Sequence, residues 1–185
     1  HMLKSIYYYI EKFDKSEIYK LNRSINLIYR NYSNKINTDE ILQLVTSCKN
    51  QRRKVYISNN LKLALKFNFD GVYIPSFNTI SNYKNIPKKN FEIIGSAHNV
   101  KEIIRKEHQG CTKIFLCPIF KTNKDRNFLG TTKFNLIRLI SNKDVISLGG
   151  INKKNIKKIK LCSVEGVAGI SWIKKNGPSI NTGPF

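Results

Sequence analysis

Eight short apolar segments, spaced about twenty residues apart, are the feature that most constrains the fold of this chain. Each is rich in Ile, Val, Leu or Tyr, and each is short enough to be a strand that is buried on both faces of a parallel sheet. The segments are Ile6–Ile10, Ile25–Tyr29, Val55–Ile57, Gly71–Ile74, Phe91–Ile94, Lys113–Cys117, Val145–Leu148 and Gly166–Ile170. Eight such strands favour a closed parallel barrel over an open sheet.

Amphipathic helical patterns lie between most of these segments, and this alternation is typical of βαβ units. The residues predicted to start helices are Thr38-Asp39, Asn60, Asn99 and Gly130, the last followed by Thr131-Thr132. Residues 77–87 carry only a weak helical pattern, and no amphipathic helix is expected after Ile173. The prediction is a compact α/β (β/α)8 TIM barrel with shortened outer helices and little or no final helix. A flavodoxin-like open sheet is the alternative.

Length and composition indicate one globular domain. The chain has 185 residues, of which 41% are hydrophobic, enough for one sizeable core. We expect the domain to span residues 3–185, with His1-Met2 as the remnant of an expression tag. No apolar run approaches the roughly 20 residues that cross a bilayer, and we expect a cytoplasmic protein with no membrane partner.

The formal net charge of +21 raises the question of nucleic-acid binding. The lysines are spread over nearly every segment, together with many Asn and Ile residues. The densest run, Lys153–Lys160, has helical spacing that places Ile156 and Ile159 inward, and this is typical of a solvated helix face. Nucleic-acid binding is therefore the remote alternative.

The four cysteines are predicted to be buried apolar residues. None forms a C-x-x-C pair, and no histidine lies at metal-ligand spacing from two of them. Neither a disulfide framework nor a zinc site is expected.

Glycine-marked turns follow the last two strand-like segments. Gly149-Gly150 ends the first segment, and Gly169 with Ser171 ends the second. Loops at these places in a (β/α)8 barrel commonly form a phosphate site. The backbone N–H groups of Gly149, Gly150, Ile170 and Ser171 are predicted to bind a phosphate group, because clustered donors attract an anion. The alternative is that the glycines only permit tight turns.

An ordered set of four turn motifs accompanies the last four strands. The motifs are Gly95–His98, Cys117–Thr122, Leu148–Ile151 and Glu165–Ile173. In this order the set resembles the thiamine phosphate synthase and TenI family, and the likeness spans nearly the whole chain. The resemblance implies thiamine biosynthesis by a transferase. Such a synthase joins a hydroxymethylpyrimidine pyrophosphate to a thiazole phosphate and releases pyrophosphate.

The resemblance also assigns roles to residues. Arg30 matches the family's arginine that pairs with phosphate oxygens. Ser96 and Lys124 are the other catalytic candidates, and His98 and Thr122 are candidates for substrate binding. The two glycine turns would then hold the thiazole phosphate.

The metal-binding half of the site departs from the family pattern. Two aspartates that would hold Mg²⁺ are replaced by Asn59 and Asn78. Neutral amides coordinate a hard dication more weakly than carboxylates do. These two residues are the metal-binding candidates that remain for Mg²⁺.

Two functions in this family therefore compete. The first is a thiamine phosphate synthase acting on small phosphorylated substrates. The second is a TenI-like protein that binds thiazole phosphate or thiamine phosphate without joining the two halves. A tautomerase of the TenI branch would need a histidine where this chain has Pro118. Synthases of this kind are often oligomeric, so the resemblance allows a homo-oligomer.

Overall fold

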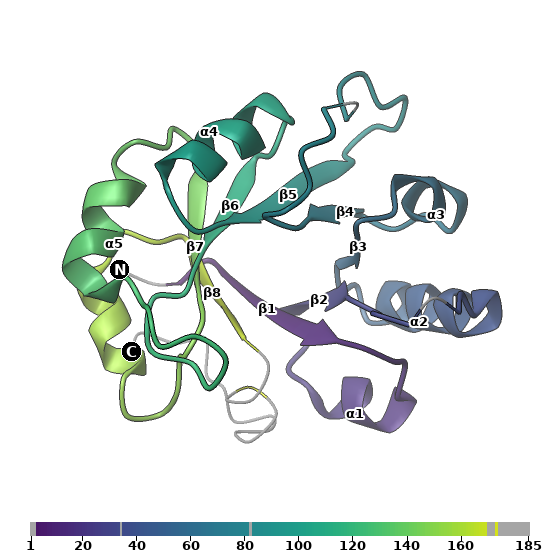
Figure 1. The fold of residues 1–185 in the computed structure, drawn as a ribbon. Helices are drawn as coiled ribbons and strands as arrows, with labels where there is room; N and C mark the ends of the chain where they lie inside the picture. The colour runs from purple at the N-terminus through teal and green to yellow at the C-terminus, as the bar shows by residue number, and fades with distance from the viewer. Residues whose placement is uncertain (1–2, 34, 82, 170–172, 174–185) are drawn as a thin grey trace.

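The structure is a computed structural model that describes residues 3–33, 35–81, 83–169 and 173. Eight parallel strands pair in chain order, and β8 pairs with β1 to close the barrel (Figure 1). The strands are β1 (Ser5–Ile10), β2 (Ile25–Tyr29), β3 (Val55–Ser58), β4 (Gly71–Ile74), β5 (Glu92–Ala97), β6 (Lys113–Leu116), β7 (Asp144–Leu148) and β8 (Gly166–Gly169). The predicted closed barrel is confirmed, and the open-sheet alternative is wrong.

Short helices surround the barrel, as predicted (Figure 1). They are α1 (Lys15–Lys20), α2 (Thr38–Asn50), α3 (Leu61–Lys66), α4 (Val100–His108), α5 (Gly130–Arg138) and the 3₁₀ helix η1 (Ile156–Leu161). Between β4 and β5, the described residues 75–81 and 83–91 form no helix. The predicted lack of a last helix concerns residues outside the described part of the chain.

The predicted start of one helix, α2, is wrong by one residue. Asn37, not Thr38-Asp39, caps α2, because its side-chain oxygen accepts from the backbone N–H of Glu40 over 3.1 Å. Helix α5 begins at Gly130, as predicted. Asn60 and Asn99 cap α3 and α4 through the same kind of bond, as expected.

Strand alternation divides the apolar residues into two cores. Tyr7 and Tyr9 of β1 point into the barrel, where Tyr7 packs edge-on against Phe115 at 4.9 Å between ring centroids. Tyr8 lies between them and packs in the outer core, between strands and helices. Its hydroxyl donates to the Glu17 carboxylate of α1. Three consecutive tyrosines therefore serve both layers, because side chains of a strand alternate in direction.

An ion network lies at the amino end of the barrel. Both carboxylate oxygens of Glu92 on β5 are occupied, one by Lys54 and the other by Lys113. Polar candidate residues gather at the opposite, carboxyl end, which is where (β/α)8 barrels place their active sites.

The structure bears on the predictions about the cysteines and about membrane-spanning helices. All four cysteines are buried and unpaired, which confirms that they serve as apolar residues. In the described part of the chain, no helix combines the length and the apolar character needed to cross a membrane.

Candidate functional site

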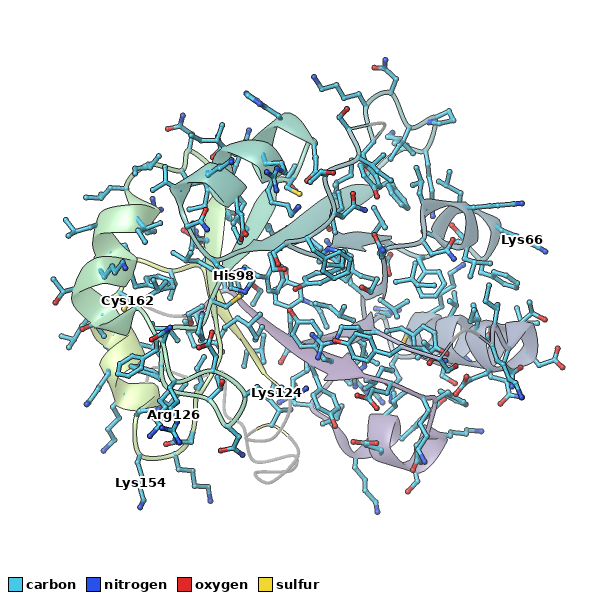
Figure 2. The ribbon with its side chains drawn as sticks, viewed as in Figure 1. Lys66, His98, Lys124, Arg126, Lys154 and Cys162 are labelled. Atoms are coloured by element: carbon cyan, nitrogen blue, oxygen red, sulfur yellow. The ribbon has the colours of Figure 1, made fainter. Side chains whose placement is uncertain are left out.

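The predicted site residues that the structure describes come from six consecutive strands or the loops after them. Arg30 follows β2, Asn59 follows β3, and Asn78 lies in the loop after β4. Ser96 and His98 lie at the end of β5, and the remaining candidates lie in the loops after β6 and β7. Figure 2 shows His98 and Lys124 on separate segments near the end of the barrel. The predicted residues Ile170 and Ser171 lie outside the described part of the chain.

Arg30 is fixed by the barrel and stacked between aromatic rings. Its backbone N–H donates to the Ile10 carbonyl over 2.8 Å. The guanidinium carbon lies 4.4 Å from the ring centroid of Tyr9 and 5.2 Å from that of Tyr32. Its Nε is buried and has no hydrogen-bond partner among the described residues. A buried donor without a partner costs about 1–3 kcal/mol, so an oxyanion that reached Nε after a small shift of its neighbours would recover that free energy.

Two phenols lie beneath Arg30 inside the barrel. The Tyr9 hydroxyl donates to the Tyr73 hydroxyl over 3.1 Å, and the rings meet edge-on at 84°. Burial raises the pKa of Tyr73 to about 12 and raises that of Tyr9 well above its ordinary value of 10.0. The hydroxyls of Tyr9 and Tyr73 therefore stay neutral at pH 7, and they place polar but uncharged groups beside Arg30 inside the barrel.

Ser96 lies within β5, not in a turn after it as the sequence indicated. Its side chain is buried, and its Oγ accepts from the backbone N–H of Ser76 over 3.0 Å. This bond ties the end of β5 to the start of the loop after β4. The correction arises because the strand continues three residues past Ile94, the end predicted from the apolar run.

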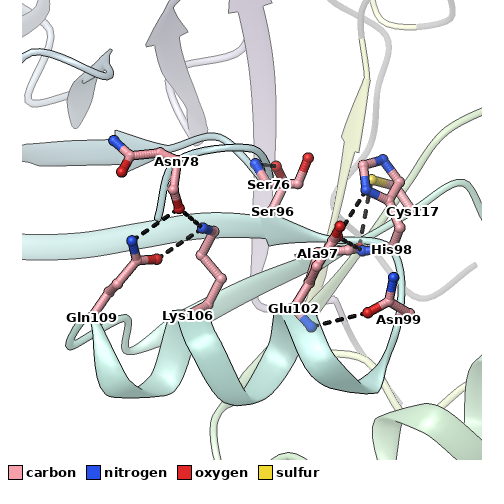
Figure 3. A network of polar contacts seen from close by, with 10 residues as sticks. All are labelled: Ser76, Asn78, Ser96, Ala97, His98, Asn99, Glu102, Lys106, Gln109 and Cys117. Carbon is pink, nitrogen blue, oxygen red and sulfur yellow. Dashed lines mark hydrogen bonds and ion pairs between the residues drawn. The ribbon is translucent and has the colours of Figure 1, made fainter. Parts of the chain in front are cut away.

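His98 is exposed and oriented by α4. Its Nδ1 lies 2.9 Å from a carboxylate oxygen of Glu102, and its backbone N–H donates to the same oxygen over 2.7 Å. Asn99 in turn caps the helix by accepting from the backbone N–H of Glu102 over 3.0 Å. The imidazole is thus positioned by the first turn of α4 (Figure 3), and its side chain remains exposed.

Asn59 and Asn78 form a direct pair. The Asn78 side chain donates from Nδ2 to Asn59 Oδ1 over 2.6 Å and to the Tyr83 hydroxyl over 2.9 Å. Asn78 Oδ1 accepts from the backbone N–H of Ile80 over 2.8 Å. Asn59 has a φ of 57°, a left-handed conformation that Asn tolerates better than most residues. The structure therefore brings the two predicted metal-site residues together, with both amide oxygens already accepting hydrogen bonds.

A buried pair on and after α4 supports Asn78 from outside the barrel (Figure 3). The fully buried Lys106 donates from Nζ to the Asn78 carbonyl over 3.0 Å and to Gln109 Oε1 over 2.8 Å. Gln109 donates from Nε2 to the same carbonyl over 3.0 Å and to the Ile80 carbonyl over 2.6 Å. Burial lowers the pKa of Lys106 below its ordinary value of 10.5. The loop after β4 is therefore held by hydrogen bonds where other connections of the barrel have a helix.

Thr122 and Lys124 lie in one tight turn after β6. The Thr122 hydroxyl accepts from the backbone N–H of Asp125 over 2.9 Å and donates to its carbonyl over 3.2 Å. Lys124 is exposed, and no hydrogen bond or ion pair joins its amine to another described residue. The turn therefore uses the Thr122 hydroxyl for its own structure, and it presents Lys124 to solvent.

Gly149 and Gly150 are required by packing as well as by any ligand. Both have positive φ, 99° and 67°. A Cβ on Gly149 would lie 2.7 Å from Pro118 Cβ, and one on Gly150 would lie 2.4 Å from the Lys121 carbonyl oxygen. The loops after β6 and β7 thus touch backbone to backbone. The Asn155 side chain fixes the turn by donating to the Gly150 carbonyl over 2.8 Å.

Comparison with known proteins decides the family. A profile of the family described as "Thiamine monophosphate synthase" matches residues 17–173. The chain belongs to the thiamine monophosphate synthase family.

Curated relatives in this family are longer than the matched region. The thiamine-phosphate synthase of Prochlorococcus marinus is 34% identical over 144 residues, which cover 72% of this chain and 40% of the relative. That of Methanococcus vannielii is 31% identical over 122 residues, which cover 64% of this chain and 58% of the relative. The matched region thus spans about half the length of these relatives.

Solved structures support the fold of this family member. A thiamine phosphate pyrophosphorylase from Pyrococcus furiosus superposes with a TM-score of 0.75 at 18% identity and covers 94% of this chain and 91% of its own. One from Bacteroides thetaiotaomicron gives a TM-score of 0.65 at 20% identity and covers 96% and 88%. At these identities the likeness shows the barrel fold alone.

The residues at the two predicted metal positions of this family member do not fit a Mg²⁺ site, because neither Asn59 nor Asn78 carries a carboxylate. Proteins usually hold magnesium through one or two carboxylates together with waters and substrate phosphates. Among the described residues, no three His, Cys, Asp or Glu side chains gather closely enough to hold a metal ion. The oxygens of Asn59 and Asn78 already accept from Asn78 Nδ2 and Ile80 N–H.

Sequence reasoning missed the residues that support the candidates. Tyr9 and Tyr73 were identified only as strand residues, although their period-two alternation with buried neighbours could have placed them inside the barrel. Lys106 carries no such signal, because a lysine in a helix normally points to solvent. Only its position over Gly95 on β5 gives it a route inward.

Proposed function

We propose that this chain acts as a thiamine phosphate synthase. It would join a hydroxymethylpyrimidine pyrophosphate to a thiazole phosphate and release pyrophosphate. The observation that carries the proposal is the half-buried Arg30 at the carboxyl end of a family barrel, whose Nε has no hydrogen-bond partner among the described residues. A guanidinium in that state is suited to bind a phosphate oxygen, because the bond satisfies a donor that the protein leaves free.

The chemistry requires positioning and charge neutralisation more than proton transfer. The C–O bond between the pyrimidine methylene and the pyrophosphate breaks, and the electron pair leaves with the pyrophosphate. The thiazole nitrogen supplies its lone pair to the methylene carbon and becomes the quaternary nitrogen of the product. Holding nucleophile and leaving group in line, and stabilising the charge on the leaving oxygen, are the protein's tasks.

The candidate residues divide between the two substrates. Arg30 would neutralise the departing pyrophosphate, and the Ser96 hydroxyl and the Lys124 amine are proposed as further donors to it. Thr122 and His98 are proposed to contact substrate. The turn at Gly149-Gly150, with Ile170 and Ser171, is proposed for the thiazole phosphate.

Pyrophosphate release with both substrates present tests this function. We expect release that depends on the pyrimidine pyrophosphate and on the thiazole phosphate together, and thiamine phosphate as the second product. Omission of either substrate is the control. Release at the same rate without the thiazole phosphate would indicate simple hydrolysis and would overturn the proposal.

A binding protein without turnover is the second candidate, and the Asn59–Asn78 pair favours it. It predicts that calorimetry detects thiazole phosphate or thiamine phosphate while no product accumulates at high protein concentration. The family match favours the synthase over this candidate.

The setting of the protein also stays a proposal. We propose that residues 3–185 form one barrel domain, that the protein acts in the cytoplasm, and that it forms a homo-oligomer. Light scattering on the purified chain measures the oligomeric state, and a mass equal to one 21.4 kDa chain would contradict the last point.

A further inference from the structure

The Asn59–Asn78 pair stands where the family resemblance expects carboxylates that hold a metal. The two side chains are hydrogen-bonded to each other, because Asn78 Nδ2 donates to Asn59 Oδ1 over 2.6 Å. The second amide oxygen, Asn78 Oδ1, accepts from the Ile80 N–H over 2.8 Å. A metal that used these oxygens would share each with a hydrogen bond already made and would gain no charged ligand.

The pair is also fixed from outside. The Asn78 carbonyl accepts from Lys106 Nζ and Gln109 Nε2, each over 3.0 Å. Asn78 Nδ2 makes its second bond to the buried Tyr83 hydroxyl. Because side chain and backbone of Asn78 are both engaged, the amide is held facing Asn59.

The cavity beside the pair is lined by one amine, by amides and by hydroxyls, and by no carboxylate. A cavity of about 280 Å³ opens next to Asn59 and is lined by Tyr29, Asn31, Ser33, Lys35, Ser58 and Asn60, among others. None of its lining residues is an aspartate or a glutamate. Arg30 is not among these residues, because its guanidinium stacks on Tyr9 of the inner core. The lining thus offers an anion one amine, and it offers a hard dication no charged ligand.

We infer that this chain binds the pyrophosphate group through guanidinium, amine and amide donors, without a divalent metal held by the protein. This inference rests on the proposed function for the identity of the anion. The Asn59–Asn78 pair then acts as a neutral wall of the site, with Lys106 and Gln109 as positioning residues that act through Asn78.

Manganese binding to the free protein tests the metal part without any substrate. Free Mn²⁺ is followed by electron paramagnetic resonance as protein is added. We compare the wild type with Asn59→Asp/Asn78→Asp, which restores two carboxylates. The matched control is Asn68→Asp/Asn142→Asp, which adds the same two charges at exposed positions. The expected result is that wild type and control leave the Mn²⁺ signal alike, whereas the restored pair binds Mn²⁺ at least about tenfold more tightly.

Stoichiometric Mn²⁺ binding by the wild type that Asn59→Ala removes would overturn the inference. Thermal unfolding of each variant shows whether it is folded before its titration is used.

Inorganic pyrophosphate then tests the anion part by calorimetry, once in EDTA and once in excess Mg²⁺. We expect binding in EDTA with a Kd no more than about threefold weaker than the Kd in Mg²⁺. Weaker binding in Mg²⁺ agrees with the inference, because Mg²⁺ also complexes pyrophosphate in solution. Binding only in Mg²⁺ would overturn the inference. No binding in either condition would overturn the proposed function, while the Mn²⁺ titration would still decide the metal question.

A double-mutant cycle tests the positioning role of Lys106. Lys106→Met keeps an unbranched side chain over Gly95 and removes the amine. We expect it to weaken pyrophosphate binding by about tenfold, and to have no further effect once Asn78→Ala is present. Equal effects in both backgrounds would show that Lys106 acts on overall stability alone and would overturn this role.

Discussion

Replacing Arg30 by methionine should separate ligand binding from stability. The change keeps an unbranched chain against Tyr9 and removes the guanidinium. If a residue binds a ligand and does not stabilise the fold, its removal should weaken ligand binding and change the stability of the protein little.

The structure sets the expected size of the stability change. Removal of the buried Nε of Arg30, which has no hydrogen-bond partner in the described part of the chain, recovers about 1–3 kcal/mol. Loss of the contacts with Tyr9 at 4.4 Å and Tyr32 at 5.2 Å costs about 0.5–1 kcal/mol each. The two effects offset, so the free energy of unfolding should lie within about 1 kcal/mol of the wild-type value, or above it.

The affinity change should be much larger. Each hydrogen bond from a charged donor contributes about 1.5–3 kcal/mol, so losing a two-point contact weakens pyrophosphate binding by about 100-fold or more. Calorimetric titration with inorganic pyrophosphate measures the affinity, and urea unfolding measures the stability. Arg23→Met is the matched control, because Arg23 lines a surface at the amino end of the barrel. An Arg30→Met protein that loses more than about 2 kcal/mol of stability and binds pyrophosphate normally would refute the reasoning.

Three further outcomes can be measured directly. Gly150→Ala should lower the thermal midpoint by several degrees, because its Cβ would lie 2.4 Å from a carbonyl oxygen and its φ is 67°; an unchanged midpoint would contradict this packing. Burial alone would raise the pKa of Glu92, but hydrogen bonds from Lys113 and Lys54 hold this pKa below its ordinary value of 4.5. Its contribution is therefore present above about pH 4.5 and lost as the pH falls through the lowered pKa, and Glu92→Gln should flatten that part of a stability–pH curve. Burial raises the pKa of Tyr73 to about 12, so its contribution to the stability of the fold is complete below pH 10 and lost as the pH rises toward 12. Tyr73→Phe should therefore lose less stability than the wild type between pH 10 and 12, and an equal loss would contradict this prediction.

The barrel could be predicted because its signal is repeated. Eight apolar segments of the right length allow few other folds, and each of them became a strand. Strand ends are harder to predict, because a polar residue is compatible with either a strand or a turn. Ser96 shows this: it faces a polar interior near the mouth of the barrel and continues β5, although its polarity indicated a turn.

The candidate site could be predicted as a set of positions, but not as a set of contacts. Motif order placed Arg30, Asn59 and Asn78 near one end of the barrel. No local sequence pattern indicates that Asn59 and Asn78 form a hydrogen bond with each other, since the two residues are 19 positions apart in the chain. The role of Lys106 was equally hidden, because it depends on the missing side chain of Gly95 in another element.

The end of β5 links the inner and outer supports of the site. Gly95 faces outward, and a Cβ there would lie 2.8 Å from both Lys106 Cδ and the Ile74 carbonyl oxygen. Ser96, the next residue, faces inward and accepts from the Ser76 N–H. The dipeptide Gly95-Ser96 therefore has two effects on the loop after β4. Gly95 leaves space for Lys106 to reach the Asn78 carbonyl, and Ser96 fixes the start of the loop. Because the described part of that loop has no helix, these bonds replace helix packing in positioning Asn78 at the mouth of the barrel.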